Sequence, residues 1–463
     1  MEKMTRNVLI LGGGYCGLAA AVELVRNGVP VTIVEKTGSL GGLSQTVTLG
    51  GVKFELGPHI YFDKDKEVKE YWREVTGGKF SQYLRDNRIF YSGKYIKSPL
   101  SVPDTFMKLG PFAVSSIMLS FLAAKFSKKP IRSAEDWVTS NFGHELFRRF
   151  FKVYNEKIWG IDSSEMTPNW AGQRIKSSLF TMIMKSVKRD HDFVIKTFDF
   201  PDGGSEVVCS SQEEILRKSG MATIRLNETV TSLENTNSTF HATFSSGDSA
   251  EFSHVISTIH LSDLNNIIRY SGKNEAALSS HIQSLRYRNL IVVNFVFKSR
   301  DVTSFKEHWI DIHDPRVKAL RVTNFSNYDF GLSTEGKSAI GLEYNCFPDD
   351  DMWRKSDEEI KQLALQDLRT MKLIDAEPSD FSAIRIPKAY PIYFIDYEKQ
   401  TNAIFAEFGK VGNLILAGRN AMYKWNNMHH SVKTGLLAAR NVLGGHNDLF
   451  SVKGMVTIGK DSD

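Results

Sequence analysis

Residues 7–36, which read NVLILGGGYCGLAAAVELVRNGVPVTIVEK, constrain the fold more than any other part of the chain. A short apolar run ends at Leu11, a segment with helical spacing ends at Gly28, and a second apolar run ends at Glu35. The turn between the first run and the helix has the spacing G-x-G-x-x-G, formed by Gly12, Gly14 and Gly17. This order of strand, glycine turn, helix, strand and acid predicts a βαβ unit that binds a dinucleotide.

Each of these positions has a physical task. Gly12 permits the tight turn, Gly14 lets a pyrophosphate approach the backbone, and Gly17 lets the helix pack closely on the strand. The diphosphate would lie on N–H groups at the positive end of the helix. Glu35 follows at the distance expected for a carboxylate that accepts hydrogen bonds from ribose hydroxyls.

A second glycine pair distinguishes FAD from NAD. After Glu35 the chain reads KTGSLGGLSQT, so Gly41 and Gly42 would let the backbone approach the cofactor again. This pattern resembles the glycine pair after the acidic residue in flavoproteins of the amine oxidase and protoporphyrinogen oxidase superfamily. The resemblance implies FAD as the cofactor.

The composition limits the number of domains, the kind of partner and the cellular compartment that we expect. The chain has 463 residues, of which 41% are hydrophobic, so it is long enough for two or three domains. Its 58 basic and 53 acidic residues are too evenly balanced to favour nucleic acid as the main partner, although a phosphate-bearing ligand fits. The three cysteines are far apart, with neither metal-like spacing nor a pairing pattern, and we expect a cytoplasmic protein.

The order of the segments predicts an α/β fold in which an FAD-binding Rossmann-like domain is assembled from separated parts of the chain. We assign to this domain residues 1–75, 201–265 and 405–463. Residues 76–200 show helical spacing and form a mostly helical insertion. Residues 266–404 form a mixed α/β substrate-binding region, with strands in LIVVNFVFK and SAIGLEYNCF and a helix in SDEEIKQLALQDLRTM.

The longest apolar stretch, residues 111–126, is shorter than the roughly 20 residues that a membrane span requires. It predicts a buried or domain-packing helix. The basic segment KFSKKPIR overlaps its end, so the alternative is peripheral contact of residues 111–132 with a membrane surface.

Several segments together resemble UDP-galactopyranose mutase, a family that uses FAD to interconvert pyranose and furanose forms of a nucleotide-linked sugar. They are GPHIYF, YNEKIWG, LRYRNL, YPI and GRNAMYKWNNMHHSV, in this order along the chain. Two others, PDGGSEVV and WAGQRI, look closer to protoporphyrinogen-oxidase-like flavoproteins of bacterial surface-polysaccharide clusters.

The resemblance assigns roles to particular residues. Those expected beside FAD are Val230 at the adenine, Gly418 and Arg419 at the pyrophosphate and ribityl chain, and Asn427, Met428 and His59 near the flavin ring. Those expected at the substrate are Arg174 and Arg288 as clamps on the diphosphate, with Tyr154, Trp159 and Tyr390 at the nucleobase and phosphate. Arginine suits a diphosphate because its fork of donors binds phosphate oxygens bidentately and stays charged.

Each assignment has a structural alternative. Arg174 would otherwise be an interface ion pair, Arg288 a strand-edge surface charge, and His59 a turn residue. Tyr154 and Trp159 would be core aromatics. The adjacent His429 and His430 should point to different sides of a helix, and because no third ligand is evident we expect no metal site.

The resemblance implies an enzyme of surface-polysaccharide biosynthesis in which the reduced flavin N5 is the nucleophile at the anomeric carbon of a nucleotide sugar. Two departures keep other functions open: Phe62 replaces a histidine of the mutase motif, and Asn427-Met428-His429 replaces its DMD. One alternative is an oxidoreductase of the protoporphyrinogen oxidase or amine oxidase type. The other is a flavoprotein scaffold without catalytic activity. The oligomeric state is left open.

Overall fold

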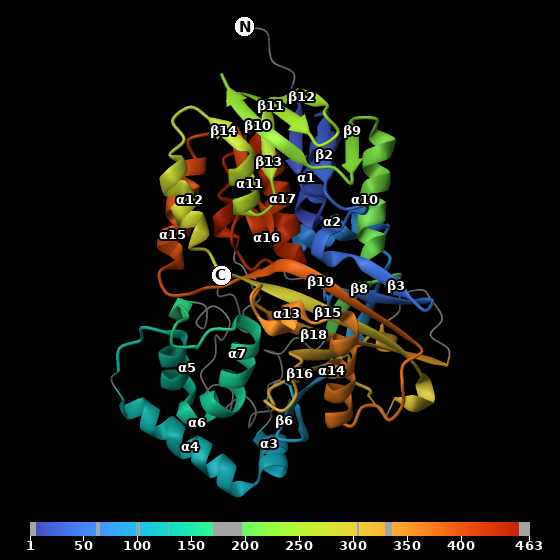
Figure 1. Ribbon diagram of the computed structural model, residues 1–463, viewed down its shortest axis with the longest axis vertical. Coiled ribbons are helices and arrows are strands. Elements are labelled where there is room, and N and C mark those ends of the chain that lie inside the picture. The colour runs from blue at the N-terminus through green and yellow to red at the C-terminus, as the bar shows by residue number, and fades with distance from the viewer. Residues whose placement is uncertain are drawn as a thin grey trace.

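The computed structural model describes residues 6–61, 65–98, 100, 102–127, 129–169, 197–302, 305–328 and 336–452. Its first layer is a five-stranded parallel sheet with the strand order β20-β13-β1-β2-β9, in the upper half of Figure 1. These strands are β1 (Val8–Leu11), β2 (Val31–Glu35), β9 (Ala222–Leu226), β13 (His254–Ser257) and β20 (Leu414–Leu416). Distant parts of the chain therefore form one sheet, and the predicted α/β class is confirmed.

The two faces of this sheet are covered differently. Val8 and Ile10 of β1 belong to one apolar core with helices α1 (Tyr15–Arg26), α10 (Ser205–Ser219) and α17 (Met428–Val442). Leu9 and Leu11 point to the opposite face, as alternation along a strand requires, and belong to a second core. That core includes a small sheet of β10 (Val230–Thr236), β11 (Thr239–Phe244), β12 (Ser249–Phe252) and β14 (Ile268–Tyr270).

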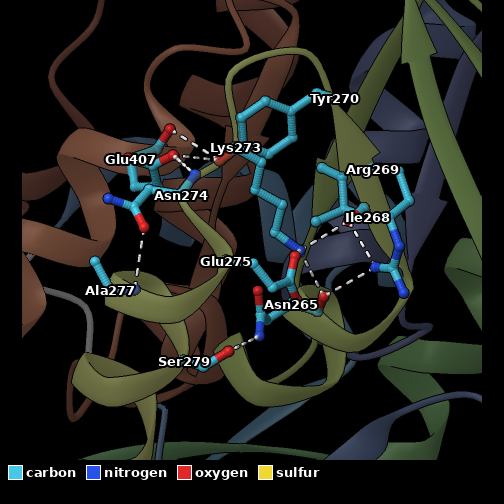
Figure 2. Close-up of polar contacts among 10 residues, drawn as sticks. All are labelled: Asn265, Ile268, Arg269, Tyr270, Lys273, Asn274, Glu275, Ala277, Ser279 and Glu407. Atoms are coloured by element: carbon cyan, nitrogen blue, oxygen red, sulfur yellow. Dashed lines mark hydrogen bonds and ion pairs between the residues drawn. The ribbon is translucent and has the colours of Figure 1, made fainter.

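Three helices beside this small sheet are held by polar contacts at the chain reversals. They are α11 (Leu261–Ile267), α12 (Glu275–Gln283) and α15 (Tyr397–Phe408). Figure 2 shows Lys273 donating to the carbonyls of Asn265 and Ile268, both at 3.0 Å, where α11 ends. The amide of Asn274 donates to Glu407 of α15 at 3.0 Å, so α15 is fixed to the start of α12.

A second, seven-stranded sheet lies below the first in Figure 1 and has the order β19-β15-β18-β17-β16-β6-β7. Its strands are β6 (Asn87–Tyr91), β7 (Lys94–Lys97), β15 (Tyr287–Lys298), β16 (Trp309–Ile312), β17 (Arg321–Asn324), β18 (Lys337–Cys346) and β19 (Asp380–Pro391). Helix α14 (Asp357–Thr370) covers one face, where Ile291, Val293 and Phe295 contact its apolar side. A site between the two sheets would therefore use the opposite face of this sheet. The strands predicted in LIVVNFVFK and SAIGLEYNCF and the helix predicted in SDEEIKQLALQDLRTM are confirmed.

The segment expected to be mostly helical begins with strands. Residues 80–97 form β5 (Phe80–Leu84), β6 and β7, and β5 pairs with β8 (Thr197–Pro201). The turn between β6 and β7 consists of Ser92 and Gly93, both with positive φ, which suits a two-residue hairpin. The helices follow: α3 (Val102–Leu109), α4 (Pro111–Phe126), α5 (Ala134–Phe142), α6 (His144–Leu146), a π-helical turn at Phe147–Phe151, and α7 (Lys152–Trp159).

Within the described part of the chain, the other elements lie around the two sheets. They are the hairpin of β3 (Thr46–Leu49) and β4 (Val52–Glu55), α2 (Lys66–Thr76), α13 (Asp351–Arg354), α16 (Gly418–Ala421) and four 3-10 turns at Gly42–Ser44, Ser299–Asp301, Phe325–Asn327 and Leu449–Ser451. None of the described helices is long and apolar enough to cross a membrane.

Candidate functional site

The turn between β1 and α1 places backbone where side chains would not fit. Gly12 has φ +100°, and a Cβ there would lie 2.5 Å from Oγ1 of Thr258. A Cβ on Gly17 would overlap the carbonyl oxygen of Gly12. At Gly14, the N-cap of α1, the nearest atom to an added Cβ is Cα of Gly42 at 3.9 Å, so this side of the turn is open. The first turn of α1 thus faces a space bordered by backbone, and its N–H groups lack partners within the helix.

The second glycine pair lies directly against the first. The amide of Gly41 donates to the carbonyl of Gly13 at 2.9 Å, and Gly14 and Gly41 form a parallel bridge. A Cβ on Gly42 would lie 3.3 Å from Cα of Gly14. The two glycine segments therefore form one continuous surface without side chains.

Glu35 ends β2 beside this surface and is 8% exposed. Its Oε2 accepts from the amide of Gly13 at 2.9 Å, and its Oε1 accepts from the amide and hydroxyl of Thr37 at 2.9 and 2.8 Å. A carboxylate has about four acceptor positions, so acceptor capacity is left for a ribose hydroxyl. Val230 begins β10 close by, because the amide of Glu228 donates to the carbonyl of Glu35 at 3.1 Å.

The third glycine segment comes from the far end of the chain. Gly418 has φ +79°, and a Cβ there would lie 3.0 Å from Cβ of Cys16 in the first turn of α1. The segments near residues 12, 41 and 418 thus lie together, as the roles assigned to Gly12, Gly41 and Gly418 require. Arg419, the next residue, donates from Nε and Nη2 to the carbonyl of Asn426 at 2.9 and 2.8 Å, and burial lowers the pKa of its guanidinium. In this structure it braces the loop before α17.

That loop ends at Asn427, the N-cap of α17, whose amide donates to Nδ1 of His430 at 3.1 Å. Met428 begins the helix and is buried. The expectation that His429 and His430 point apart is wrong, because their ring centroids are 3.8 Å apart. Burial lowers the pKa of His430 to about 2, with His429 as the next cause, so this ring is neutral at neutral pH.

An aromatic chain connects this loop to the second sheet. Trp425 contacts Trp159, with ring centroids 4.7 Å apart, and Tyr390, at 5.0 Å. Arg419 lies over the ring of Tyr390 at 5.5 Å. Tyr390, expected at the substrate, thus lies beside Arg419, expected at the cofactor, and Trp159 is connected to Tyr390 through Trp425. Trp159 is completely buried, as in a core aromatic, whereas Trp425 was not predicted although it lies two residues before Asn427.

Arg288 is buried, only 5% exposed, at the start of β15 and is not a surface charge. Its Nη2 donates to the carbonyl of Asn345 at 2.6 Å, and its guanidinium lies 4.3 Å from the ring of Phe347. The nearest acid is Asp350, at 3.7 Å. Among the described residues, Nε of Arg288 has no hydrogen-bond partner. Burial lowers the pKa of this guanidinium, with Asp350 acting in the opposite direction.

Helix α7 contacts Arg288 and is itself attached to the second sheet. Gly160, just after α7, has φ +69°, and a Cβ there would overlap the Arg288 guanidinium. Near the end of the helix, Nζ of Lys157 lies within hydrogen-bond distance, 2.8–3.2 Å, of four backbone carbonyl oxygens, those of Ile312, Asp314, Val317 and Ala319. The end of α7 is therefore attached to the second sheet.

Three charged side chains that the sequence analysis missed lie across neighbouring strands on the face away from α14. Arg321 of β17 pairs with Asp311 of β16 at 2.9 Å and with Glu343 of β18 at 3.2 Å, and the three residues are direct cross-strand neighbours. Tyr154 joins them: its hydroxyl donates to Asp311 at 3.0 Å and accepts from Arg321 at 3.2 Å. We refer to Tyr154, Asp311, Arg321 and Glu343 as the polar face.

The charges of the polar face depend on one another. Burial alone would raise the pKa of Asp311, but the adjacent Arg321 holds it below its usual value. For Glu343 burial dominates and raises the pKa against the pull of Arg321. The predicted His59 lies beside this face: Gly57 is adjacent to Glu343, and Nδ1 of His59 is 2.9 Å from Glu55 Oε2.

Arg174, the other expected clamp, lies outside the described residues, as does Phe62. Within the described part of the chain, no group of three histidine, cysteine or acidic side chains is arranged to hold a metal ion.

The parallel sheet, its glycine surface and Glu35 define a protein with a Rossmann-type dinucleotide-binding site. The chain belongs to the flavin containing amine oxidoreductase family, whose model matches residues 15–443. It is 25% identical over 173 residues to the probable UDP-galactopyranose mutase of Klebsiella pneumoniae, an alignment that covers 35% of this chain and 43% of that protein. The chain thus matches less than half the length of this relative.

Two solved structures share the fold over nearly the whole chain. A crystal structure of reduced UDP-galactopyranose mutase has a TM-score of 0.82 at 20% identity, covering 97% of this chain and 96% of that one. A putative protoporphyrinogen oxidase from Exiguobacterium sp. 255-15 has a TM-score of 0.75 at 17% identity, covering 95% and 99%. The cofactor is FAD, and the open side of Gly14 and the remaining acceptor capacity of Glu35 fit its diphosphate and ribose.

Proposed function

We propose that the protein is an FAD-dependent nucleotide-sugar mutase of surface-polysaccharide biosynthesis that interconverts pyranose and furanose forms. The observation that carries this proposal is the state of Arg288, a buried cation with incomplete pairing. Its nearest acid is 3.7 Å away, and one of its nitrogens has no hydrogen-bond partner among the described residues. A charged group in such a place is costly unless a further partner supplies hydrogen bonds and opposite charge.

A nucleoside diphosphate supplies both. Two phosphates offer several acceptor oxygens, and a guanidinium binds them in a bidentate manner. An uncharged lipid-like substrate would leave Arg288 without this partner. The aromatic rings of Trp425 and Tyr390, next to Arg419, offer surfaces for a nucleobase or sugar ring.

When bound and reduced, FAD supplies a nucleophilic N5 for the anomeric carbon. The work of the chain is to bind and orient the substrate. Arg288, and in our proposal Arg174, hold the diphosphate and stabilise its charge as it departs, while Gly160 fixes the place of the Arg288 guanidinium. Nδ1 of His59 lies 2.9 Å from Oε2 of Glu55, a contact that orients the ring.

Replacing Arg288 tests the proposal. Loss of a charge-assisted contact to a diphosphate costs roughly 1.5–3 kcal/mol, so Arg288→Ala should weaken binding of uridine diphosphate by about tenfold or more while retaining FAD. Titration calorimetry measures the binding, and visible absorbance measures the flavin. Activity on the nucleotide sugar should require prior reduction of the flavin and consume no stoichiometric oxygen.

The matched control is Arg286→Ala, two residues earlier. Arg286 also lies over a phenylalanine ring, that of Phe394 at 5.3 Å, and also has one acid nearby, Glu165 at 3.8 Å, but its side chain is 51% exposed. The Arg286→Ala protein should bind uridine diphosphate as tightly as the wild type does. If the wild type binds no nucleoside diphosphate at millimolar concentration, the proposal fails.

The second candidate is an oxidoreductase of the protoporphyrinogen oxidase or amine oxidase type. The rings of Trp159, Trp425 and Tyr390 suit this function as well, because aromatic side chains also line sites for apolar substrates. Turnover that consumes oxygen one-for-one with product would support this function and exclude the mutase.

A further inference from the structure

The apolar side chains that remain exposed are concentrated in one place. Among the described residues, ten large hydrophobic side chains are clearly exposed, and seven of them come from residues 106–131. We refer to these seven as the α3–α4 apolar face: Phe106, Met107, Phe112, Leu119, Leu122, Phe126 and Ile131. The most exposed are Phe112, at 90%, and Phe126, at 86%. Scattered single apolar residues are normal on a surface, whereas their concentration in one segment of the chain points to an interaction site.

Helical geometry places four of these side chains on one side of α4. At about 100° per residue, Leu119, Leu122 and Phe126 fall within roughly 80° of Phe112 around the helix axis. Ile117 and Phe121 are buried on the opposite side. The helix is therefore apolar on both sides, although only one side is covered by the protein.

The uncovered side is a fixed surface. Glycine at position 143 allows the start of α6 to approach the backbone of Phe121, where an added Cβ would lie 2.7 Å from the amide nitrogen. The amide of Glu145 also donates to the Ser120 hydroxyl at 3.0 Å. Figure 1 shows α4 along the lower edge of the molecule, on the side away from the parallel sheet.

The charge around this face indicates its partner. Residues 105–133 contain five basic residues and no acidic one. Asp104, just before them, is buried and its carboxylate accepts from the amide of Lys97 at 2.8 Å. A second copy of the chain would bring the same positive charge to the contact and be repelled, whereas anionic lipid headgroups would attract it.

We propose that the α3–α4 apolar face binds an anionic membrane surface, with its apolar side chains in the interface and the lysines and arginine around them at the headgroups. Helix α4 has 16 residues, which suits lying on a bilayer and is too few to span one. The proposal is independent of the reaction at the flavin, since none of the α3–α4 side chains belongs to the site described above.

Vesicle sedimentation of the FAD-loaded protein tests this. One set of vesicles contains phosphatidylcholine with about 30% phosphatidylglycerol, and the other contains phosphatidylcholine alone. We expect the protein to bind the anionic set, less strongly as salt rises from about 0.1 to 0.5 M. The double substitution Phe112→Ser/Leu119→Ser should weaken that binding about tenfold or more, and Lys125→Gln/Lys129→Gln should reduce the preference for anionic vesicles.

The matched control is Phe450→Ser/Leu84→Ser, which replaces the same residue types at exposed positions outside the face. Retained flavin absorbance and an unchanged unfolding midpoint establish that each variant is folded. Wild-type protein that stays in the supernatant with both vesicle sets overturns the proposal. So does a stable dimer by light scattering that the Phe112→Ser/Leu119→Ser variant dissociates, because the face would then join two copies.

Discussion

The glycine surface beside α1 and the polar face of the second sheet form sites by opposite means. The first depends on the absence of side chains: Gly14, Gly17 and Gly42 let backbone approach backbone, and the open side of Gly14 leaves room for a ligand. The second works because charged side chains are present and buried together, with Arg321 between Asp311 and Glu343. Substitutions in the first region should therefore act through volume, and substitutions in the second through charge.

The sharpest test of the volume argument compares two glycines of one turn. Gly17→Val should lower the free energy of unfolding by about 4 kcal/mol or more, because its Cβ would overlap the carbonyl of Gly12. Gly14→Val faces the open side and should fold but lose FAD. Urea unfolding and the ratio of flavin to protein measure the two effects. A Gly14→Val protein with a full complement of FAD would break the comparison.

The charge argument predicts a large effect without a change of backbone. Arg321→Met keeps much of the side-chain volume but leaves Asp311 and Glu343 without their cation, and removing one partner of a buried ion pair costs about 3–5 kcal/mol. The control is Arg369→Met, whose pair with Glu377 is exposed and should matter by less than about 1 kcal/mol. Equal losses of unfolding free energy in the two variants would contradict a special role for the polar face.

A smaller effect should appear on acidification. His313 stacks on Tyr154 with ring centroids 4.4 Å apart, and burial lowers its pKa to about 4, against the influence of Asp311. Between pH 6.5 and 4 the unfolded chain binds a proton at this residue that the folded chain does not, so stability falls as pH falls.

His313→Phe keeps the stacked ring and removes the titration. The wild type should therefore lose up to about 3 kcal/mol relative to this variant between pH 6.5 and 4, measured by urea unfolding at each pH. The difference should be constant above pH 6.5. Parallel curves for the two proteins throughout this range would contradict the prediction, because they would show that the pKa of His313 is the same in the folded and unfolded chain.

The two regions also differ in how far the sequence predicts them. Gly12 to Gly17, Glu35 and Gly41 lie within one short stretch, so spacing along the chain is enough to place them together. The polar face depends on which strands pair and in which register, because Asp311, Arg321 and Glu343 are neighbours only across β16, β17 and β18. A signal was present in Glu343, a charged residue inside the apolar strand SAIGLEYNC, but its partners cannot be read from that strand alone.

The segment before the helices shows a related limit. Strands β6 and β7 are short, and their residues carry aromatic and charged side chains that also fit a helical surface. What makes them strands is the turn at Ser92-Gly93 and the pairing of β6 with β16, more than 200 residues later in the chain. The cofactor residues predicted by resemblance, among them Asn427 and Met428, are likewise placed by a loop whose structure depends on Arg419.

The C-terminal end of α7 is attached to the second sheet by several hydrogen bonds. Lys157 is held by carbonyls of residues 312–319, the carbonyl of Ile158 accepts from Asn345 at 3.0 Å, and Gly160 closes on Arg288. The attached end of α7 thus determines where the guanidinium of Arg288, a residue of β15, can lie. Replacing Lys157 with a shorter side chain would remove the hydrogen bonds of its Nζ. It would thereby shift the guanidinium of Arg288 without changing any atom of Arg288 itself.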